Sequence, residues 1–277
     1  MSETDDFRIL DRGAHVTHWR PAGAAHPVLW SSAIAESSAE RAWRGGVPIC
    51  APWFAAGPDG RRSPSHGPAR TAVWEALVPD GDDAGEGLTR HRLEVRGDAA
   101  GAPARLELEL TTRRGADSLE TALELRNAGD GPALVEAALH SYFAVSDVTA
   151  IALEGLERAP FFDKVSGLVR APGEAPPFGE LVDRVHESRR GDVVIADAGW
   201  SRRLRIEREG AAEIVVWNPG PDHEPGDVEP GDWRGFVCVE AAVLGAGAVT
   251  LAPGAGHRLV SRVRVEPMPA GDAGDEA

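Results

Sequence analysis

One stretch of the sequence places a histidine where a proton could be exchanged with a ligand. We interpret the largely apolar run Leu134–Val145 as a β-strand, in which successive side chains point to opposite faces. On that reading His140 lies near the middle of the strand. Its side chain then points to the same face as Glu136, Ala138 and Tyr142, the only tyrosine in the chain. This face is neither purely apolar nor purely charged. A hydrogen-bonded structural histidine is the alternative interpretation.

A second stretch, Phe236–Ala242, sets a carboxylate between apolar residues. Strand periodicity puts Phe236, Cys238 and Glu240 on one face. An unpaired buried charge is expensive, so such a carboxylate is either neutralised by a cation or has a functional role. The pattern by itself leaves both interpretations of Glu240 open.

Two arginines stand beside glycines. Arg44 precedes Gly45 and Gly46, and Arg70 closes the run that begins at His66. Glycine allows a backbone to approach a ligand closely, and a guanidinium group can donate two hydrogen bonds to paired oxygens. Surface ion pairs are the alternative for both arginines, and His66 could be a plain turn residue.

Asp183 lies in a short apolar run and could cap a turn or accept hydrogen bonds from sugar hydroxyls. Other catalytic patterns are missing from the sequence. The nine histidines and two cysteines do not have CxxC, HxH or HExxH spacing. The sequence also contains neither a Gly-x-Ser-x-Gly elbow nor a phosphate-binding loop motif. We therefore expect no metal.

The elements that would position these residues are short strands. Period-two alternation recurs along the chain, with runs bounded by Gly, Pro, Asn or Asp. A helical period is not sustained, and Ala33–Trp43 is the only weak candidate. The predicted strands are Phe7–Leu10, Val28–Ser31, Leu88–Val95, Ala104–Thr111, Ser118–Asn127, Leu134–Val145, Val193–Ala196, Leu204–Glu207, Ile214–Trp217, Phe236–Val239 and Leu259–Val265. Many strands without long helices indicate an all-β fold, a large antiparallel β-sandwich.

The chain of 277 residues has no break in composition, which favours one domain over residues 7–267. We expect residues 1–6 and 268–277 to be disordered tails, because both are polar and acidic. Three segments rich in Gly, Pro and acidic residues are expected to be surface loops, and loops of this length can border a site. These are Pro79–Gly87, Ala171–Glu180 and Pro219–Asp232.

Composition limits the class of partner. A formal net charge of −15 disfavours nucleic acid or an anionic membrane as the partner. Only two cysteines occur, Cys50 and Cys238, which suits a reducing compartment, and the first residues lack the apolar segment of a signal peptide. We expect a cytoplasmic monomer. Lys164 is the only lysine, and base bias of the genome is the simplest explanation for that.

Six motifs in order give the chain a family resemblance. They are Arg-Gly-Gly-Val-Pro-Ile-Cys-Ala-Pro-Trp-Phe at 44–54, His-Gly-Pro-Ala-Arg at 66–70, Leu-His-Ser-Tyr-Phe at 139–143, Asp-Arg-Val at 183–185, Val-Trp-Asn-Pro at 216–219 and Phe-Val-Cys-Val-Glu at 236–240. Together they resemble the glucose-6-phosphate 1-epimerase family, also called hexose-6-phosphate mutarotases, within the aldose 1-epimerase superfamily. The resemblance extends from about Asp11 to Val265, nearly the whole chain.

The resemblance implies a galactose mutarotase-like β-supersandwich and a mutarotase that uses no cofactor. It assigns His140 as general acid and Glu240 as general base, and the two should converge in one pocket. It gives Arg44, Arg70 and Asp183 substrate-binding roles. The substrate would be a small sugar or sugar phosphate.

Two alternatives remain. The sequence departs from the family pattern at Ser65, at Pro68 and in the acidic segment 220–232. Arg44 and Arg70 favour a phosphorylated hexose, whereas the acidic segment favours an unphosphorylated aldose. A carbohydrate-binding sandwich without catalytic activity is the other alternative, but such a module needs no paired acid and base.

Overall fold

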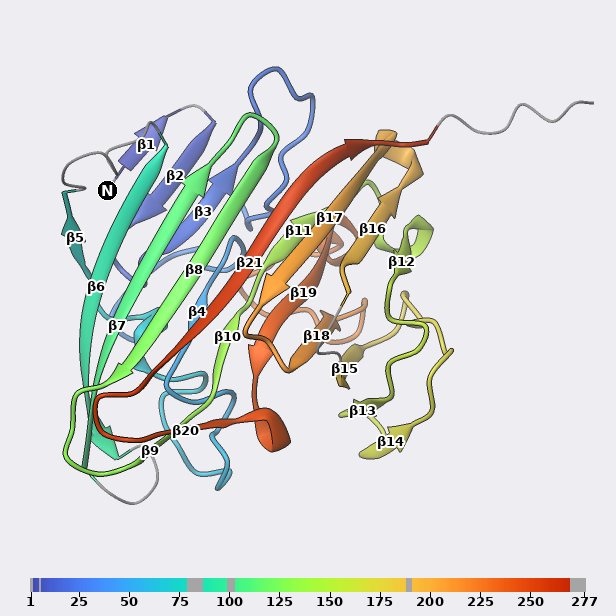
Figure 1. Cartoon of the computed structure of the whole chain (residues 1–277). Helices are drawn as coiled ribbons and strands as arrows, with labels where there is room; N and C mark the ends of the chain where they lie inside the picture. Colours follow the sequence, from blue (N-terminus) through green and yellow to red (C-terminus); the bar gives the residue numbers. More distant parts are fainter. Residues whose placement is uncertain (1, 5, 79–86, 99–102, 188–190, 270–277) are drawn as a thin grey trace, which may run out of the picture.

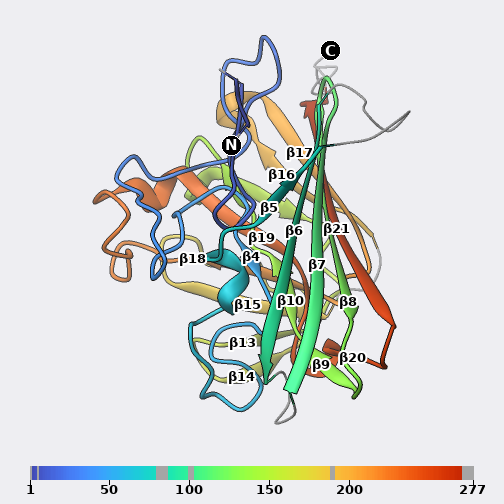
Figure 2. The same cartoon turned by 90° about the vertical axis from the view of Figure 1, so that its left-hand side faces the viewer.

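The computed structural model describes residues 2–4, 6–78, 87–98, 103–187 and 191–269. The two main elements are eight-stranded antiparallel sheets that pack face to face (Figures 1 and 2). Within the described residues the helical elements are single 3₁₀ turns, namely η1 (Pro68–Arg70), η3 (Val148–Ala150), η4 (Ala198–Trp200), η5 (Asp232–Gly235) and η6 (Gly245–Gly247). The prediction of an all-β fold built from antiparallel sheets is therefore confirmed.

The first sheet contains the longest strands. In spatial order it runs β12 (Ala152–Glu154), β16 (Val193–Asp197), β17 (Arg202–Glu209), β21 (Gly256–Pro267), β8 (Ser118–Asn127), β7 (Pro103–Arg114), β6 (Leu88–Asp98) and β5 (Glu75–Leu77). Strand β8 shows the expected alternation, because Leu119, Leu123 and Leu125 are buried while Glu124 is exposed. One face of this sheet thus packs into the core, and the other faces solvent.

The middle of the second sheet is covered on both faces, whereas its edge strands near Phe162 and Val169 are exposed. Its order is β14 (Leu168–Arg170), β13 (Phe161–Asp163), β15 (Val182–Glu187), β18 (Glu213–Asn218), β19 (Phe236–Val243), β10 (Ala137–Leu139) and β4 (Ile49–Cys50), and β11 (Tyr142–Ala144) also pairs with β19. All eight residues of β19 are buried. A strand buried on both faces has one face in the core and a second face free to form the floor of a site.

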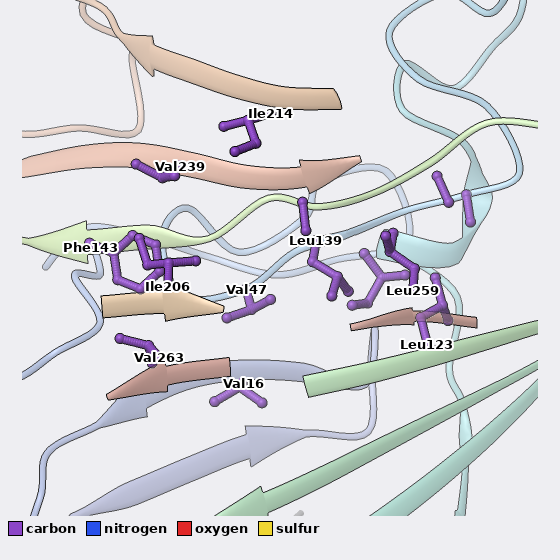
Figure 3. Close-up of a cluster of buried hydrophobic side chains, with 14 of the residues drawn as sticks. Val16, Val47, Leu123, Leu139, Phe143, Ile206, Ile214, Val239, Leu259 and Val263 are labelled. Atoms are coloured by element: carbon purple, nitrogen blue, oxygen red, sulfur yellow. The ribbon is translucent and has the colours of Figure 1, made fainter. Parts of the chain in front are cut away.

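The core fills the space between the two sheets. Leu139, Ile214 and Val239 point inward from the second sheet, and Ile206, Leu259 and Val263 meet them from the first (Figure 3). These side chains are all less than 5 % exposed. Burial of this kind stabilises a fold by about 25 cal/mol per Å² of apolar surface.

Two smaller sheets complete the structure. One consists of β20 (Val249–Leu251) and β9 (Ala133–Val135), and the other of β1 (Ser2–Thr4), β2 (Phe7–Leu10) and β3 (His15–Trp19). Residues 2–4, within the segment 1–6 that we expected to be disordered, form β1, since backbone pairing with β2 needs no apolar side chains. Of the expected C-terminal tail, residues 270–277 lie outside the described residues.

Three local predictions need correction. Val28–Ser31 is not a strand and makes only isolated bridges, Leu29 to Phe143 and Ser31 to Gly45. Ala33–Trp43, the weak helix candidate, is irregular. Leu134–Val145 is divided among three short strands instead of forming one, since its ends pair with different partners.

The predicted loops agree with the structure where it describes them. The segments 171–177 and 219–231 contain no named element, although most of 79–87 lies outside the described residues. None of the helices in the described part of the chain is long and apolar enough to span a bilayer.

Candidate active site

The register of the second sheet brings His140 opposite Glu240. Leu139 pairs with Ala241 on one side of the gap between β10 and β11, and Tyr142 pairs with Cys238 on the other side in the same register. His140 therefore faces Glu240 across the two strands, where opposite side chains lie close together. Its Nδ1 is 3.4 Å from Glu240 Oε1. The predicted convergence is found, despite the 100 positions between the two residues.

A parallel row of residues crosses the sheet beside this pair. Tyr142 faces Cys238, Cys238 faces Trp217, and Trp217 faces Asp183. The strand alternation puts this row on the same face as His140 and Glu240, away from the core. The faces predicted from the sequence are thus observed.

These two rows form the floor of a hollow of about 170 Å³. It is lined by Arg44, Phe54, Ala55, His66, His140, Tyr142, Lys164, Asp183, Val215, Trp217 and Glu240. The loop before β4, the turn after β13 and the loop that carries His66 supply its walls. Two larger hollows, beside Arg20 and beside Arg92, contain no histidine.

The floor contains two buried polar atoms without hydrogen-bond partners, although one of them, His140 Nδ1, lies 3.4 Å from Glu240 Oε1. His140 Nδ1 and Glu240 Oε2 make no hydrogen bond within the described protein, although both side chains are nearly inaccessible. Leaving a buried polar atom unsatisfied costs about 1–3 kcal/mol. Two such atoms in one hollow indicate groups held ready for a ligand.

Burial shifts the pKa values of His140 and Glu240 in opposite directions. Removal from water, reinforced by the charges of His66 and Arg70, holds the pKa of His140 well below its usual value. Burial, and then the neighbouring Asp183, raises the pKa of Glu240 well above its usual value, with Lys164 and Arg70 opposing the shift. The pair therefore retains one proton over a wide range of pH, because the histidine resists a second proton and the carboxyl group resists losing its own.

Arg44 reaches the pocket and is already paired. Its Nη1 donates to the Tyr142 hydroxyl at 3.0 Å, and its Nε donates to Asp227 at 2.9 Å. Burial disfavours its charge, but the oxygens of Tyr142 and Asp227 outweigh that effect and raise its pKa. Asp227 belongs to the acidic segment 220–232, so that segment places a negative charge beside Arg44.

The glycines after Arg44 have a different role from the one predicted. Gly46 has a φ of 64°, and a Cβ there would lie 2.1 Å from the carbonyl oxygen of Val16. The close approach is therefore to the protein's own β3 and not to a ligand. This close packing of Gly46 against β3 fixes the position of the loop that carries Arg44.

Arg70 ends η1 and is half-buried. It does not line the hollow directly, but its charge is close enough to lower the pKa of both His66 and His140. Within the described part of the chain, no hydrogen bond or ion pair engages its side chain. Its guanidinium group is available to an anion, unlike that of Arg44.

Asp183 lies on β15 at the far end of the row. Its Oδ2 is 2.8 Å from Lys164 Nζ. Burial raises the pKa of Asp183, and Lys164 partly opposes the shift. The sequence alone had left Asp183 as a turn cap or a ligand for hydroxyls, and its position in a strand rules out the turn.

The sequence interpretation left His66, Lys164 and Trp217 without a role, although all three line the hollow. His66 adopts a left-handed φ of 65°, and its Nδ1 accepts the Ala55 backbone N–H at 3.3 Å. In the neutral ring, the proton is then on Nε2. The signal for His66 and Trp217 was their place inside two of the six motifs.

The described residues contain no group of three or more His, Cys, Asp or Glu side chains arranged to hold a metal ion. Cys50 and Cys238 are free thiols buried near the pocket floor. Burial raises the pKa of the Cys50 thiol to about 12, so it is not a nucleophile at neutral pH.

Comparison with known proteins agrees with this geometry. The family model described as aldose 1-epimerase matches residues 6–264. A relative from Salmonella typhimurium named "Putative glucose-6-phosphate 1-epimerase" is 34 % identical over 235 residues, which is 83 % of this chain and 76 % of that protein.

Solved structures show the same fold. A crystal structure of a "putative mutarotase (YeaD)" from Salmonella typhimurium superposes with a TM-score of 0.79 and 29 % identity, covering 96 % of this chain and 92 % of that one. A galactose mutarotase-like protein from Lactobacillus casei gives a TM-score of 0.69 at 15 % identity, covering 95 % and 98 %, a likeness of fold alone. The predicted galactose mutarotase-like fold and family resemblance are confirmed: this chain belongs to the aldose 1-epimerase family.

Proposed function

We propose that the protein interconverts the α and β anomers of a hexose 6-phosphate, with glucose 6-phosphate as the first candidate. The observation that carries the proposal is the pair of His140 and Glu240, 3.4 Å apart at the floor of a sugar-sized hollow. The names of the relatives support the phosphorylated substrate, as does the unpaired guanidinium group of Arg70.

Anomerisation opens the hemiacetal ring, turns the C1–C2 bond and closes the ring from the other face. Opening needs one proton delivered to the ring oxygen and one removed from the C1 hydroxyl. In the proposed mechanism His140 delivers the first and Glu240 accepts the second. Closure reverses both transfers, so no proton is consumed overall. One proton shared by the pair is enough for both steps when it lies on His140, because Glu240 is then ionised and can act as the base.

Arg44, Arg70 and Asp183 would hold the sugar while the open aldehyde turns. Arg70 has the free donors that a phosphate needs, since charge-assisted hydrogen bonds are about twice as strong as neutral ones. We also propose a cytoplasmic location, which the two unpaired cysteines support.

An unphosphorylated aldose is the second candidate, and one observation favours it. Asp227 neutralises Arg44 and would repel a phosphate bound there. Under this alternative the acid and base keep their roles, and the arginines contribute only to the shape and charge balance of the pocket.

Catalysis is tested first with Glu240→Gln, which keeps the shape and removes the base. Its rate of anomerisation, followed by polarimetry on freshly dissolved sugar, should fall by roughly 10²–10⁴-fold. Glu187→Gln, at the exposed end of β15, is the matched control and should match the wild type. A wild-type protein that does not accelerate the decay would contradict catalysis and leave the carbohydrate-binding sandwich.

Phosphate recognition is tested with Arg70→Ala. If Arg70 binds the 6-phosphate, kcat/KM for glucose 6-phosphate should fall by roughly 10- to 100-fold, because a hydrogen bond to a charged group contributes about 1.5–3 kcal/mol. Turnover of glucose should hardly change, since it never uses that contact. An unchanged ratio between the two substrates would favour the unphosphorylated aldose.

A further inference from the structure

The only lysine of the chain lines the candidate active site. Of 29 lysine and arginine residues, one is lysine, and it is Lys164 at the wall of the hollow. Base bias explains why the other basic positions are arginine, but by itself gives no reason for a lysine at this one. An ammonium group is a compact charge with three donors, whereas a guanidinium group is a large planar fork. Lys164 therefore places a small cation next to the carboxylate of Asp183.

The protein holds Lys164 in a defined place. It follows β13, and its backbone N–H donates to the Asp183 carbonyl at 2.9 Å. The next turn is fixed by Asp163, whose carboxylate accepts from the Val165 N–H at 3.1 Å and from the Ser166 hydroxyl at 2.7 Å. The lysine stem therefore leaves the turn in one direction, toward the pocket.

Lys164 and Asp183 form a donor and an acceptor side by side. Nζ lies 2.8 Å from Asp183 Oδ2 and 5.6 Å from the centre of the Phe54 ring. Asp183 engages one of the three ammonium donors, so two remain. The carboxylate has a second oxygen and further lone pairs. Because the ammonium and carboxylate charges cancel, this corner of the pocket offers little attraction to a phosphate dianion and suits a neutral polar group.

We propose that Lys164 and Asp183 bind two neighbouring ring hydroxyls of the sugar, which makes Lys164 a specificity-determining residue. Asp183 accepts a hydrogen bond from one hydroxyl, and Lys164 donates to the oxygen of the next. The 2.8 Å between the two charged atoms is comparable with the spacing of adjacent hydroxyl oxygens on a pyranose ring. Asp183 belongs to the row of residues next to the one that contains His140 and Glu240. A sugar whose C1 lies at His140 and Glu240 therefore extends its ring hydroxyls toward Lys164 and Asp183.

The inference rests on the proposed function but is tested separately from it. Lys164→Met keeps the stem against Phe54 and removes every donor. Lys164→Gln keeps one N–H donor for Asp183 and serves if the methionine variant does not fold. Arg203→Gln breaks the surface ion pair with Glu154 on the first sheet and is the control for loss of one positive charge.

Steady-state constants are measured for glucose, glucose 6-phosphate and the 2-, 3- and 4-deoxy analogues of glucose. We expect Lys164→Met to raise KM for both parent sugars by roughly 10- to 100-fold, with kcat within about threefold of the wild type. For the analogue that lacks the hydroxyl bound by Lys164, KM should be almost the same in Lys164→Met and in the wild type. Arg203→Gln should be unchanged with every substrate.

The inference would be overturned if Lys164→Met raised KM equally for all three deoxy analogues, or raised it for no sugar. A loss confined to glucose 6-phosphate would overturn it too, because Lys164 would then bind the phosphate. Calorimetric titration with glucose gives a readout that needs no catalysis. If the wild type binds glucose without anomerising it, the proposed function fails, whereas weaker binding by Lys164→Met still supports the hydroxyl-binding pair.

Discussion

At the scale of single residues, the proposed acid, His140, and the proposed base, Glu240, share one environment. Both lie on the second sheet, both are buried, and burial opposes charge on each. An isolated histidine at the surface would lose its proton near pH 6.5. In this pair the raised pKa of Glu240 keeps a proton bound at higher pH. The lowered pKa of His140 prevents a second proton from binding until the pH is lower.

This predicts an unusual dependence of activity on pH. The value of kcat/KM, corrected for buffer catalysis, should stay level as pH rises through 6.5. It should fall in acid as His140 gains the second proton, and in alkali as Glu240 loses the shared one. A single loss of activity with a midpoint near 6.5 would show that His140 titrates as an independent group, contrary to the shifts described above.

Arg44 shows how one residue can fit two interpretations. It makes the ion pair expected of an arginine in an acidic chain, and it also lines the pocket. The contact with Tyr142 orients the guanidinium group toward His140 and Glu240. A ligand anion at Arg44 would have to compete with Asp227, whereas one at Arg70 would not.

At the scale of elements, loops bring the second group of residues to the sheet. The loop after β18 carries Asp227 to Arg44, and Asn218 anchors both ends of that loop. Its Nδ2 donates to the carbonyls of Trp233 at 2.8 Å and Phe236 at 2.9 Å, and its Oδ1 accepts the Gly220 N–H at 2.9 Å. Asn218 is fully buried, so the amide has no access to water as an alternative partner.

Replacing Asn218 with Asp should therefore destabilise the protein more than replacing it with Ala. Asp would turn a carboxylate toward two carbonyl oxygens, and an uncompensated buried charge costs about 3–5 kcal/mol. Ala would leave backbone groups unsatisfied, at about 1–3 kcal/mol. Urea unfolding at pH 7 measures both. Equal stability of Asn218→Asp and the wild type would show that the loop is anchored by other contacts.

At the scale of the whole molecule, several histidines are buried without charge. His15 is inaccessible, with Nε2 2.7 Å from the Gly45 carbonyl oxygen, and burial lowers its pKa to about 3. Burial and the charge of Arg184 lower the pKa of His186 to about 4. Both groups belong to the folded state as neutral rings.

This predicts that the protein loses stability as pH falls below about 6.5. In the unfolded chain these histidines bind protons from that pH downward, whereas in the folded chain they stay neutral until about pH 3–4, so acid favours unfolding. Between pH 7 and pH 5 the free energy of unfolding should drop by about 2 kcal/mol for each of the two.

Urea unfolding at pH 7 and pH 5 checks this, and His15→Gln should reduce the drop by about 2 kcal/mol because glutamine does not titrate. The control is His223→Gln at an exposed position, which should leave the drop unchanged. A drop of the same size in His15→Gln would contradict the role of His15.

Much of the fold is determined by local sequence. Alternation in Ser118–Asn127 predicts the bounds of β8, and alternation in Phe236–Val239 predicts which side of β19 meets the core. The inaccurate predictions have a common cause. Val28–Ser31 and Leu134–Val145 have the composition of strands, but pairing partners decide where a strand begins and ends, and those partners are distant in sequence.

The candidate site divides in the same way. The sequence alone determined that His140 projects to the same side as Tyr142, and Glu240 to the same side as Cys238, because side-chain direction alternates along extended backbone. Only the tertiary structure decided that they face each other, since a shift of register by one residue would have separated them. The pairing of Arg44 with Asp227, 183 positions apart, and of Lys164 with Asp183 depends on loop paths over the sheet, which no local pattern encodes.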